Sequence, residues 1–231
     1  MQEVLRQEKK FLLSLPQTYA LGHRLSQVMT EDIHNQNGGY SIRSLYFDTL
    51  DNTDYLDKEN GIELRRKIRL RCYSPDAAFA QLEMKQKQGP YQKKRSLRIP
   101  REDARQLIAG NYSVLLRQQD PFAAECFALL QMHGYRPRSV VEYRRRAFVA
   151  RENNIRVTLD SRISATESCL DLFSPTLAQT MVTDPALAIL EVKYNGFLLS
   201  YIKDLLQSCS VSETSASKYG MSRAVSMHAT F

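Results

Sequence analysis

Polar and apolar residues alternate along several short segments of the chain, most clearly in residues 61–73. The charged positions there are Glu63, Arg65, Lys67, Arg69 and Arg71, and the apolar positions are Ile62, Leu64, Ile68, Leu70 and Cys72. Because successive side chains of a β-strand point to opposite faces, this period predicts a strand with one cationic face and one apolar face. Similar alternation at residues 82–87, 155–160 and 188–194 predicts further strands of this kind.

An antiparallel sheet with one face in water also alternates, and for a single strand that is the more common explanation. The polar positions here differ because arginine and lysine predominate, while serine, threonine and glutamine are scarce. A glutamate precedes a lysine by two residues in Glu8/Lys10, Glu83/Lys85 and Glu191/Lys193. If the strands close into a barrel, water, carboxylates or an anionic ligand must neutralise the like charges brought together inside it. The pattern therefore predicts a site for a polyanion.

The other elements follow from periodicity and from turn residues. Strands are also predicted at residues 6–13, 40–48, 79–87, 93–99 and 138–150, and helices at 18–30, 100–109, 121–133 and 200–209, with a short helix or loop at 51–59 and a helical tail after residue 217. Thr18 is the expected N-cap of the first helix. Turns are expected at residues 37–39, 89–90 and 152–154. The helices should cover the outside of an antiparallel sheet, which gives an α+β fold.

Length and composition narrow the class of protein. A chain of 231 residues can bury a sizeable core, and we expect a single domain spanning residues 1–231. The formal net charge of +7 and the pI near 9.2 favour anionic partners such as phosphates, nucleic acid or acidic membrane surfaces. The four cysteines form no CxxC pair, so we expect no zinc site and a reducing compartment. No apolar run is long enough to span a membrane, which predicts a cytoplasmic protein.

Some basic and acidic residues are candidates for phosphate chemistry. Arginine and lysine donate hydrogen bonds to phosphate oxygens, and the candidates from spacing alone are Arg69, Arg71, Lys85 and Arg156. Glu191 lies between apolar residues on a predicted central strand, two residues before Lys193. A buried carboxylate in a phosphate site commonly binds Mg²⁺ or Mn²⁺. A salt bridge to Lys193 or Arg71 is an equally weighted alternative role for Glu191.

Other chemistries have little support in the sequence. The chain has no GxxxxGK[ST], GxGxxG, GxSxG or HExxH motif, and its four histidines are scattered. Phosphoryl transfer needs no protein nucleophile, because positioning and charge neutralisation by cations and metal ions suffice. The abundance of basic side chains is typical of that requirement.

Eight short motifs in order resemble a known family: RQEKKF, IRSLYFD, IRLRCY, LEMK, YRRRAF, RVTLD, LEVKY and SKYG. Together they resemble the polyphosphate polymerase domain of vacuolar transporter chaperone (VTC) complexes and its bacterial relatives, from about residue 6 to residue 220. That family belongs to the triphosphate tunnel metalloenzymes. The resemblance implies an eight-stranded antiparallel β-barrel with a charged lumen and with helices packed on the outside.

The resemblance also implies roles for particular residues. Those expected to line the tunnel and hold nucleotide triphosphate or polyphosphate are Lys10, Arg69, Arg71, Lys85, Lys94, Arg145, Arg156 and Lys193. Glu191 would bind the metal, Mn²⁺ or Mg²⁺, and further contacts would come from Tyr143, Ser217 and Lys218, with Lys58 and Arg43 as additional candidates. Ser215 stands where family members can have a lysine, so one phosphate contact of the family is missing.

The function implied is a metal-dependent polyphosphate polymerase that transfers the γ-phosphate of ATP to a growing polyphosphate chain. A triphosphatase on the same fold and a noncatalytic module that binds polyphosphate or nucleotide are the alternatives. The expected ligands are ATP, triphosphate and polyphosphate, and a separately encoded membrane subunit would be needed to move product across a membrane. Nucleic acid is not the expected partner despite 12 tyrosines, because the basic residues lie at interior strand positions without an aromatic series.

Overall fold

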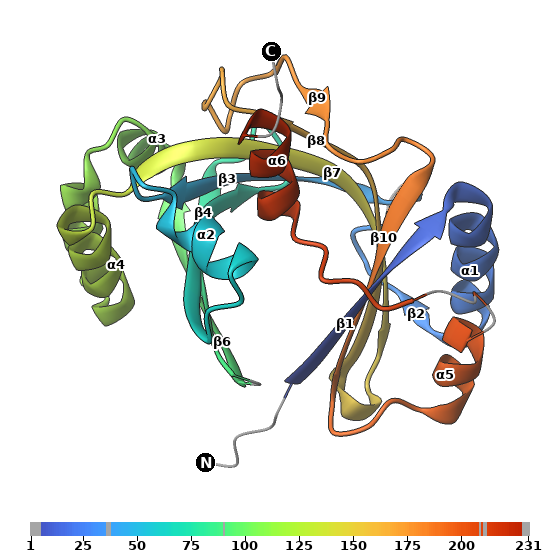
Figure 1. Ribbon diagram of the computed structural model, residues 1–231. Coiled ribbons are helices and arrows are strands. Elements are labelled where there is room, and N and C mark those ends of the chain that lie inside the picture. The colour runs from blue at the N-terminus through green and yellow to red at the C-terminus, as the bar shows by residue number, and fades with distance from the viewer. Residues whose placement is uncertain (1–5, 36–37, 90, 208, 210–211, 228–231) are drawn as a thin grey trace. The chain divides into compact units, whose positions relative to one another are not determined.

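The computed structural model describes residues 6–35, 38–89, 91–207, 209 and 212–227 (Figure 1). The chain groups into two compact units. Unit 1 comprises Met1–Ser41, Tyr143–Ile163 and Met181–Ser217, and unit 2 comprises Ile42–Glu142, Ser164–Thr180 and Lys218–Phe231. Asn37 and Pro90 of two expected turns lie outside the described residues, and the assignment of one domain stays a prediction.

Eight long strands dominate the secondary structure. They are β1 (Arg6–Ser14), β3 (Tyr40–Asp48), β4 (Leu64–Cys72), β5 (Phe79–Gln88), β6 (Tyr91–Pro100), β7 (Arg136–Ala150), β8 (Ile155–Thr166) and β10 (Leu187–Asn195), with β2 (Thr30–Glu31) and β9 (Thr180–Met181) as short additions. The hydrogen-bonded order is β1-β10-β8-β7 in unit 1 and β7-β3-β4-β5-β6 in unit 2. The expected α+β fold with a large antiparallel sheet is confirmed. Within the described residues, the hydrogen-bonded path ends at β1 and β6 and is not closed.

The helices are close to those expected. They are α1 (Leu15–Val28), α2 (Thr53–Glu59), α3 (Arg101–Ile108), α4 (Pro121–Met132), α5 (Ser200–Gln207) and α6 (Lys218–Met227), with 3₁₀ helices η2 (Tyr112–Gln118) and η3 (Glu152–Asn154). Thr18 as N-cap of α1 was wrong. Ser14 caps this helix in a capping box with Gln17, so α1 begins directly after β1, and the Thr18 hydroxyl donates to the Ser14 carbonyl inside the first turn. In the described part of the chain, no helix is long and apolar enough to cross a lipid bilayer.

The core of unit 1 lies between its strands and the helices α1 and α5, which lie side by side in Figure 1. Buried core residues include Leu13, Leu21, Leu25, Phe148, Val157, Leu190, Val192 and Ile202. On β10 the core residues Leu190 and Val192 alternate with Glu191 and Lys193. The apolar face of the strands is therefore covered by helices, and the charged residues occupy the opposite face.

Unit 2 has the same two-sided construction. Its core combines strand residues with α3, α4 and η2 and includes Ile68, Leu70, Cys72, Leu82, Met84, Leu107, Leu115, Phe122 and Leu130. The apolar residues of β4 are buried from Ile68 onward, whereas Leu64 and the preceding Ile62 are exposed. Four cysteines, including the buried Cys72 and Cys126, are free thiols.

Candidate functional site

The polar face of unit 1 brings together residues from three adjacent strands. In the strand register, Glu8 of β1 is opposite Lys193 of β10, which is opposite Arg156 of β8. One row further, Lys10 is opposite Glu191, which in turn is opposite Thr158. Cross-strand neighbours lie about 4.5–5.5 Å apart at Cβ, so each acid of this face has a basic neighbour on the adjacent strand, and Lys193 also has Arg156 beside it.

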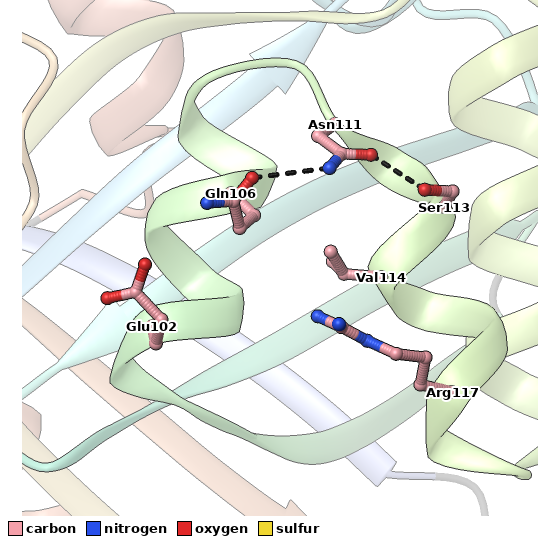
Figure 2. A pocket seen from close by; sticks show the side chains of 6 residues that line it. All are labelled: Glu102, Gln106, Asn111, Ser113, Val114 and Arg117. Carbon is pink, nitrogen blue, oxygen red and sulfur yellow. Dashed lines mark hydrogen bonds between the residues drawn. The ribbon is translucent and has the colours of Figure 1, made fainter.

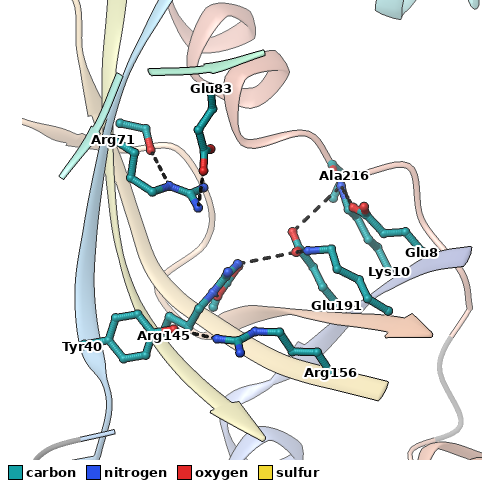
Figure 3. Close-up of polar contacts among 12 residues, drawn as sticks. Glu8, Lys10, Tyr40, Arg71, Glu83, Arg145, Arg156, Glu191 and Ala216 are labelled. Carbon is teal, nitrogen blue, oxygen red and sulfur yellow. Dashed lines mark hydrogen bonds and ion pairs between the residues drawn. The ribbon is translucent and has the colours of Figure 1, made fainter. Parts of the chain in front are cut away.

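Glu191 is the centre of this arrangement (Figure 3). Its carboxylate accepts a hydrogen bond of 2.7 Å from the Lys193 ammonium and lies 3.5 Å from the Arg145 guanidinium and 4.0 Å from Lys10 Nζ. Lys10 also pairs with Glu8 at 3.2 Å. The salt bridge between Glu191 and Lys193, expected as one of the two roles of Glu191, is present.

Arg145 of β7 is fixed by a second buried carboxylate. Its Nε and one terminal nitrogen each donate to an oxygen of Asp160 at 2.6 Å, and Asp160 is fully buried. Burial alone would lower the pKa of Arg145, but Asp160 first and Glu191 with it raise that pKa well above its usual value. The guanidinium carbon lies 5.3 Å from the ring centre of Tyr143. Asp160 thus sets the orientation of Arg145, a role the sequence did not assign.

Arg156 is held at the edge of the same face. Its guanidinium donates to Asp32 at 2.6 Å and to the Tyr40 hydroxyl at 3.1 Å. Burial would raise the pKa of Asp32, but hydrogen bonds from the His34 backbone and from Arg156 lower it overall. The Arg156 side chain keeps about a third of its surface exposed, so a ligand can approach it.

The segment before the SKYG motif is attached to β1. Phe11 bridges to Glu213, the Thr214 amide donates to the Lys10 carbonyl at 2.8 Å, and Lys10 Nζ donates to the Ala216 carbonyl at 2.9 Å. Ser217 follows Ala216 directly in the chain. It is half-buried and is the last residue of unit 1. The exposed Ser215 lies in the same segment.

Unit 2 gathers basic residues around a single carboxylate, Glu83 of β5. Arg69 lies 2.6 Å from it and Lys94 also 2.6 Å. Arg71 lies 3.7 Å from the same carboxylate (Figure 3). Burial alone would raise the pKa of Glu83, but these three cations hold it far below its usual range. Lys85 lies in register with Lys94 on the same face. The structure thus brings together four of the predicted phosphate-binding residues in unit 2.

The two additional candidates lie elsewhere. Arg43 pairs in register with Cys72, on the helix-covered side of the sheet. Its guanidinium is buried and is hydrogen-bonded to Glu142 and to the carbonyls of Leu172 and Ser174. Lys58 is on α2 and pairs with Glu59 at 2.9 Å. The structure therefore does not bring Arg43 or Lys58 together with Arg69 and Arg71.

Lys218 and the rest of the SKYG motif begin α6 in unit 2. The next residue, Tyr219, donates from its hydroxyl to Asp48 at 2.6 Å and stacks on Tyr46 with ring centres 4.9 Å apart. The Tyr46 hydroxyl accepts a hydrogen bond of 2.9 Å from Arg69. Two stacked tyrosines therefore connect the position of buried Lys218 to that of Arg69. Their place in IRSLYFD and SKYG is the only sequence signal for this role.

The donor atoms around Glu191 fit a divalent metal that is also bound by phosphate. The Thr158 hydroxyl, opposite Glu191, is buried and has no hydrogen-bond partner among the described residues. Carboxylate and hydroxyl oxygens suit Mg²⁺ or Mn²⁺. No group of three histidine, cysteine or acidic residues in the described chain could hold a metal by itself. Phosphate and water oxygens would therefore have to complete the coordination shell.

A separate depression of about 460 Å³ lies on the helix layer of unit 2 (Figure 2). It is lined by Glu102, Gln106, Asn111, Ser113, Val114 and Arg117. The Asn111 amide donates to Gln106, and Arg117 is paired with Asp103 at 2.6 Å. Since its lining has one acid for its one arginine, this depression lacks the excess of cations that a polyanion requires.

Comparison with known proteins identifies the family. No curated protein sequence matches the chain. Three solved structures, each 14% identical, share its fold. One is a candidate adenylyl cyclase from Hippeastrum with a dominant triphosphatase activity, with a TM-score of 0.56 and 94% of each chain covered. The others are candidate adenylate cyclases from Vibrio parahaemolyticus, with a TM-score of 0.52 and 95% of this chain and 98% of that chain covered, and from Bacillus halodurans, with a TM-score of 0.50 and 93% of each chain covered. This is the triphosphate tunnel fold that the resemblance implied. A family model, the VTC domain, matches residues 5–227, and the chain therefore belongs to the VTC domain family.

Proposed function

We propose that this protein is a metal-dependent polyphosphate polymerase that uses ATP. The observation that carries the proposal is the convergence of Arg69, Arg71 and Lys94 on Glu83, with Lys85 beside Lys94. Such a concentration of cations suits a ligand with several adjacent phosphates. The membership in the VTC family supports a polymer as the product. We further propose that the whole chain works as one domain.

In the proposed reaction, a terminal phosphate oxygen of the polyphosphate chain attacks the γ-phosphorus of ATP. A new P–O bond forms, the bond between the γ-phosphorus and the β–γ bridging oxygen breaks, and ADP leaves with the electron pair. Arg69, Arg71, Lys85 and Lys94 in unit 2 would bind phosphate oxygens. Their donors are held in place before the reaction, so little reorganisation is needed as charge develops.

Residues of unit 1 would act in the same reaction. The additional phosphate-binding residues are Lys10, Arg145, Arg156, Lys193, Tyr143 and Ser217, together with Lys218 of unit 2. Asp160 keeps Arg145 in one orientation, and Asp32 does the same for Arg156. Glu191 would hold Mn²⁺ or Mg²⁺, which when bound would neutralise charge on the triphosphate.

A triphosphatase is the second candidate, and the fold of the Hippeastrum protein with its dominant triphosphatase activity favours it. Water would then replace the polyphosphate end as the attacking group. The basic residues would have the same roles, because both reactions cleave a bond to a terminal phosphoryl group. A noncatalytic module would bind triphosphate and leave ATP unchanged.

The test is to incubate the purified chain with ATP and Mn²⁺ and to resolve the products by length on a gel. Phosphate chains longer than triphosphate, lost in Arg71→Gln, are expected. Arg105→Gln on the exposed side of α3 is the matched control and should retain them. Orthophosphate alone would overturn the polymerase in favour of the triphosphatase, and unchanged ATP with tight triphosphate binding would indicate a binding module.

A cytoplasmic location and a separately encoded membrane partner belong to the same proposal. The four free thiols are consistent with a reducing compartment. Co-purification of the tagged chain with a membrane fraction, lost on deletion of a neighbouring membrane-protein gene, would support a partner.

A further inference from the structure

Two buried aspartates of unit 2 lie where α6 packs against α2 (Figure 1). Asp48, at the end of β3, is fully buried, and Asp54, in the first turn of α2, is 2% exposed. The Asp48 carboxylate accepts hydrogen bonds of 2.6 to 3.0 Å from the Tyr219 hydroxyl of α6 and from the backbone amides of Thr49, Asp54 and Tyr55. Its negative charge is therefore well compensated, and it caps the first turn of α2.

Asp54 has far less compensation than Asp48. One of its carboxylate oxygens accepts a hydrogen bond of 2.8 Å from Tyr135, and the other is buried without a hydrogen-bond partner among the described residues. The Asp54 amide is bonded to the Asp48 carboxylate, so the two acids belong to one small buried cluster. A negative charge on Asp54 is costly because it is desolvated and lies beside a second negative charge. A proton on the unpartnered oxygen removes that cost.

The groups around Asp54 do not offset this cost. Those that face it are Asp48 of β3, Asp57 of α2, Arg66 of β4, Tyr135 before β7 and Tyr219 of α6. Burial first, and the charge of Asp48 second, raise the pKa of Asp54 to about 7, although Tyr135 and Arg66 act in the opposite direction. Ionisation of Asp54 therefore strains the contact between α2 and α6.

α6 is the element of this region that can separate most easily. In addition to the contacts of Tyr219, Arg223 donates to Asn52 at 2.8 Å and pairs with Glu167. Tyr219 is buried, but no described residue of α6 is part of the contiguous apolar cluster that forms the core of unit 2. Elements outside the core open at a lower free energy than core strands and helices. Separation of α6 is thus the least costly way to bring water to Asp54.

We propose that Asp48 and Asp54 form a proton-dependent latch for α6: protonated Asp54 keeps α6 docked on α2, and ionised Asp54 favours its release. Release would also affect ligand binding, because Tyr219 stacks on Tyr46, whose hydroxyl accepts a hydrogen bond from Arg69. This second step rests on the proposed function, whereas the docking of α6 does not. Acidification is expected to strengthen both docking and phosphate binding.

Linkage fixes the pH range of the effect. Once water reaches Asp54, its pKa should return to about 3.9. The docked state, in which that pKa is raised, keeps its full advantage below about pH 4 and loses it progressively as the pH rises to about 7. The equilibrium constant for opening of α6 should increase by up to about tenfold for each pH unit in this range and change little above it.

The experiment measures hydrogen exchange of α6 by mass spectrometry in the ligand-free chain at about pH 5 and about pH 8, with labelling times scaled for the intrinsic pH dependence of exchange. α4, which contributes four residues to the core of unit 2, is the internal reference. The variant is Asp54→Asn, which is neutral at both pH values. The matched control is Asp57→Asn, which removes a partly exposed carboxylate of the same helix.

In the parent and in Asp57→Asn, opening of α6 should increase about tenfold or more from the lower to the higher pH, and α4 should stay more protected than α6 throughout. In Asp54→Asn the change should be within about twofold. Equal pH dependence in the parent and Asp54→Asn, or equal protection of α6 and α4, would overturn the latch. If Asp54→Asn does not fold, Tyr135→Phe serves instead: the loss of its hydrogen bond should raise the pKa of Asp54 further, so opening should continue to increase between about pH 7 and about pH 8. Opening that levels off as in the parent would contradict the latch.

Binding of inorganic triphosphate, without ATP, tests the link to the phosphate site. The loss of affinity from about pH 5 to about pH 8 should be several-fold larger in the parent than in Asp54→Asn, and titration of the ligand itself cancels in this comparison. Equal losses would overturn the control of phosphate binding by α6. A chain that makes no polymer from ATP would refute the polymerase and leave both measurements valid.

Discussion

The polar faces of the two units solve the same problem of crowded charge in different ways. In unit 1 each basic residue has an acid of its own: Lys10 with Glu8, Lys193 with Glu191, Arg145 with Asp160 and Arg156 with Asp32. In unit 2 one carboxylate, Glu83, is shared by three cations, Arg69, Arg71 and Lys94. The first face is nearly balanced, and the second has an excess of positive charge.

The difference indicates a division of tasks. Paired charges keep fixed orientations without a ligand, so the unit 1 face is suited to positioning a reacting group. An unbalanced cationic surface attracts polyanions and becomes more stable when one binds, so the unit 2 face is suited to holding phosphates.

Glu191→Gln should reduce ATP turnover by about a thousandfold or more, because the change removes the carboxylate proposed to hold the metal. Turnover is measured at saturating Mn²⁺, and thermal unfolding is used to establish that the variant is folded. Glu213→Gln, at an exposed carboxylate of the same unit, is the control and should leave turnover unchanged. Undiminished metal-dependent turnover in Glu191→Gln would refute the metal assignment.

Glu83→Gln should destabilise the free protein by about 3–5 kcal/mol, because three cations lose their shared partner. Triphosphate should restore much of that loss, so the ligand-induced increase in Tm should be larger than in the parent. The folded-state pKa of Glu83 is depressed, so its stabilising contribution is present above about pH 4.3 and is lost as the pH falls.

Asp160→Asn tests the corresponding carboxylate of unit 1. This change should also destabilise the protein, but triphosphate should restore less stability, because Asp160 is fully buried beneath Arg145. Equal rescue of both variants by triphosphate would remove the distinction between the two faces.

Asp54→Asn tests a buried acid of unit 2 for which the described residues provide no salt bridge. Burial first, and then the charge of Asp48, raise the pKa of Asp54 to about 7, and Tyr135 donates to it at 2.8 Å. Since the unfolded-state pKa is about 3.9, the parent should lose up to about 4 kcal/mol of stability as the pH rises from about 4 to about 7. The variant should lack this loss, so urea unfolding should find it relatively more stable at pH 8 than at pH 5. The same difference at both pH values would contradict a raised pKa.

Alternation in the sequence was sufficient to predict the long strands, the helix-covered apolar face and the shared face of Arg69, Arg71 and Lys85, whereas Lys94 was named only from the family resemblance. A period of two places side chains on one face independently of distant contacts. The capping of α1 by Ser14 was missed because the strand continues directly into the helix, with no loop to mark the boundary.

The partners of the basic residues were harder to predict than the basic residues themselves. Asp160 contacts Arg145 from a different strand, and Tyr219 contacts Asp48 across 171 positions of sequence. Arg43 was wrongly placed among the ligand-binding candidates. Most residues of its strand, β3, are buried on both faces, so burial along IRSLYFD does not distinguish the two faces of the sheet. Such pairings depend on strand order, which periodicity along a single segment does not contain.

Tyr219→Phe should have the smallest effect of these changes. It tests whether phosphate binding on the cationic face of unit 2 depends on the exact positions of its side chains. The change removes the hydrogen bond to buried Asp48 but keeps the stack on Tyr46, so stability should fall by about 1–3 kcal/mol. Since Lys218 precedes Tyr219 and Arg69 contacts Tyr46, KM for ATP should rise several-fold while kcat changes little. Tyr112→Phe is the control, because it removes another buried tyrosine hydrogen bond of unit 2, to the Tyr135 carbonyl. If both variants lose stability and neither changes KM, Tyr219 supports the fold alone, and charge without precise positioning is sufficient for phosphate binding on this face.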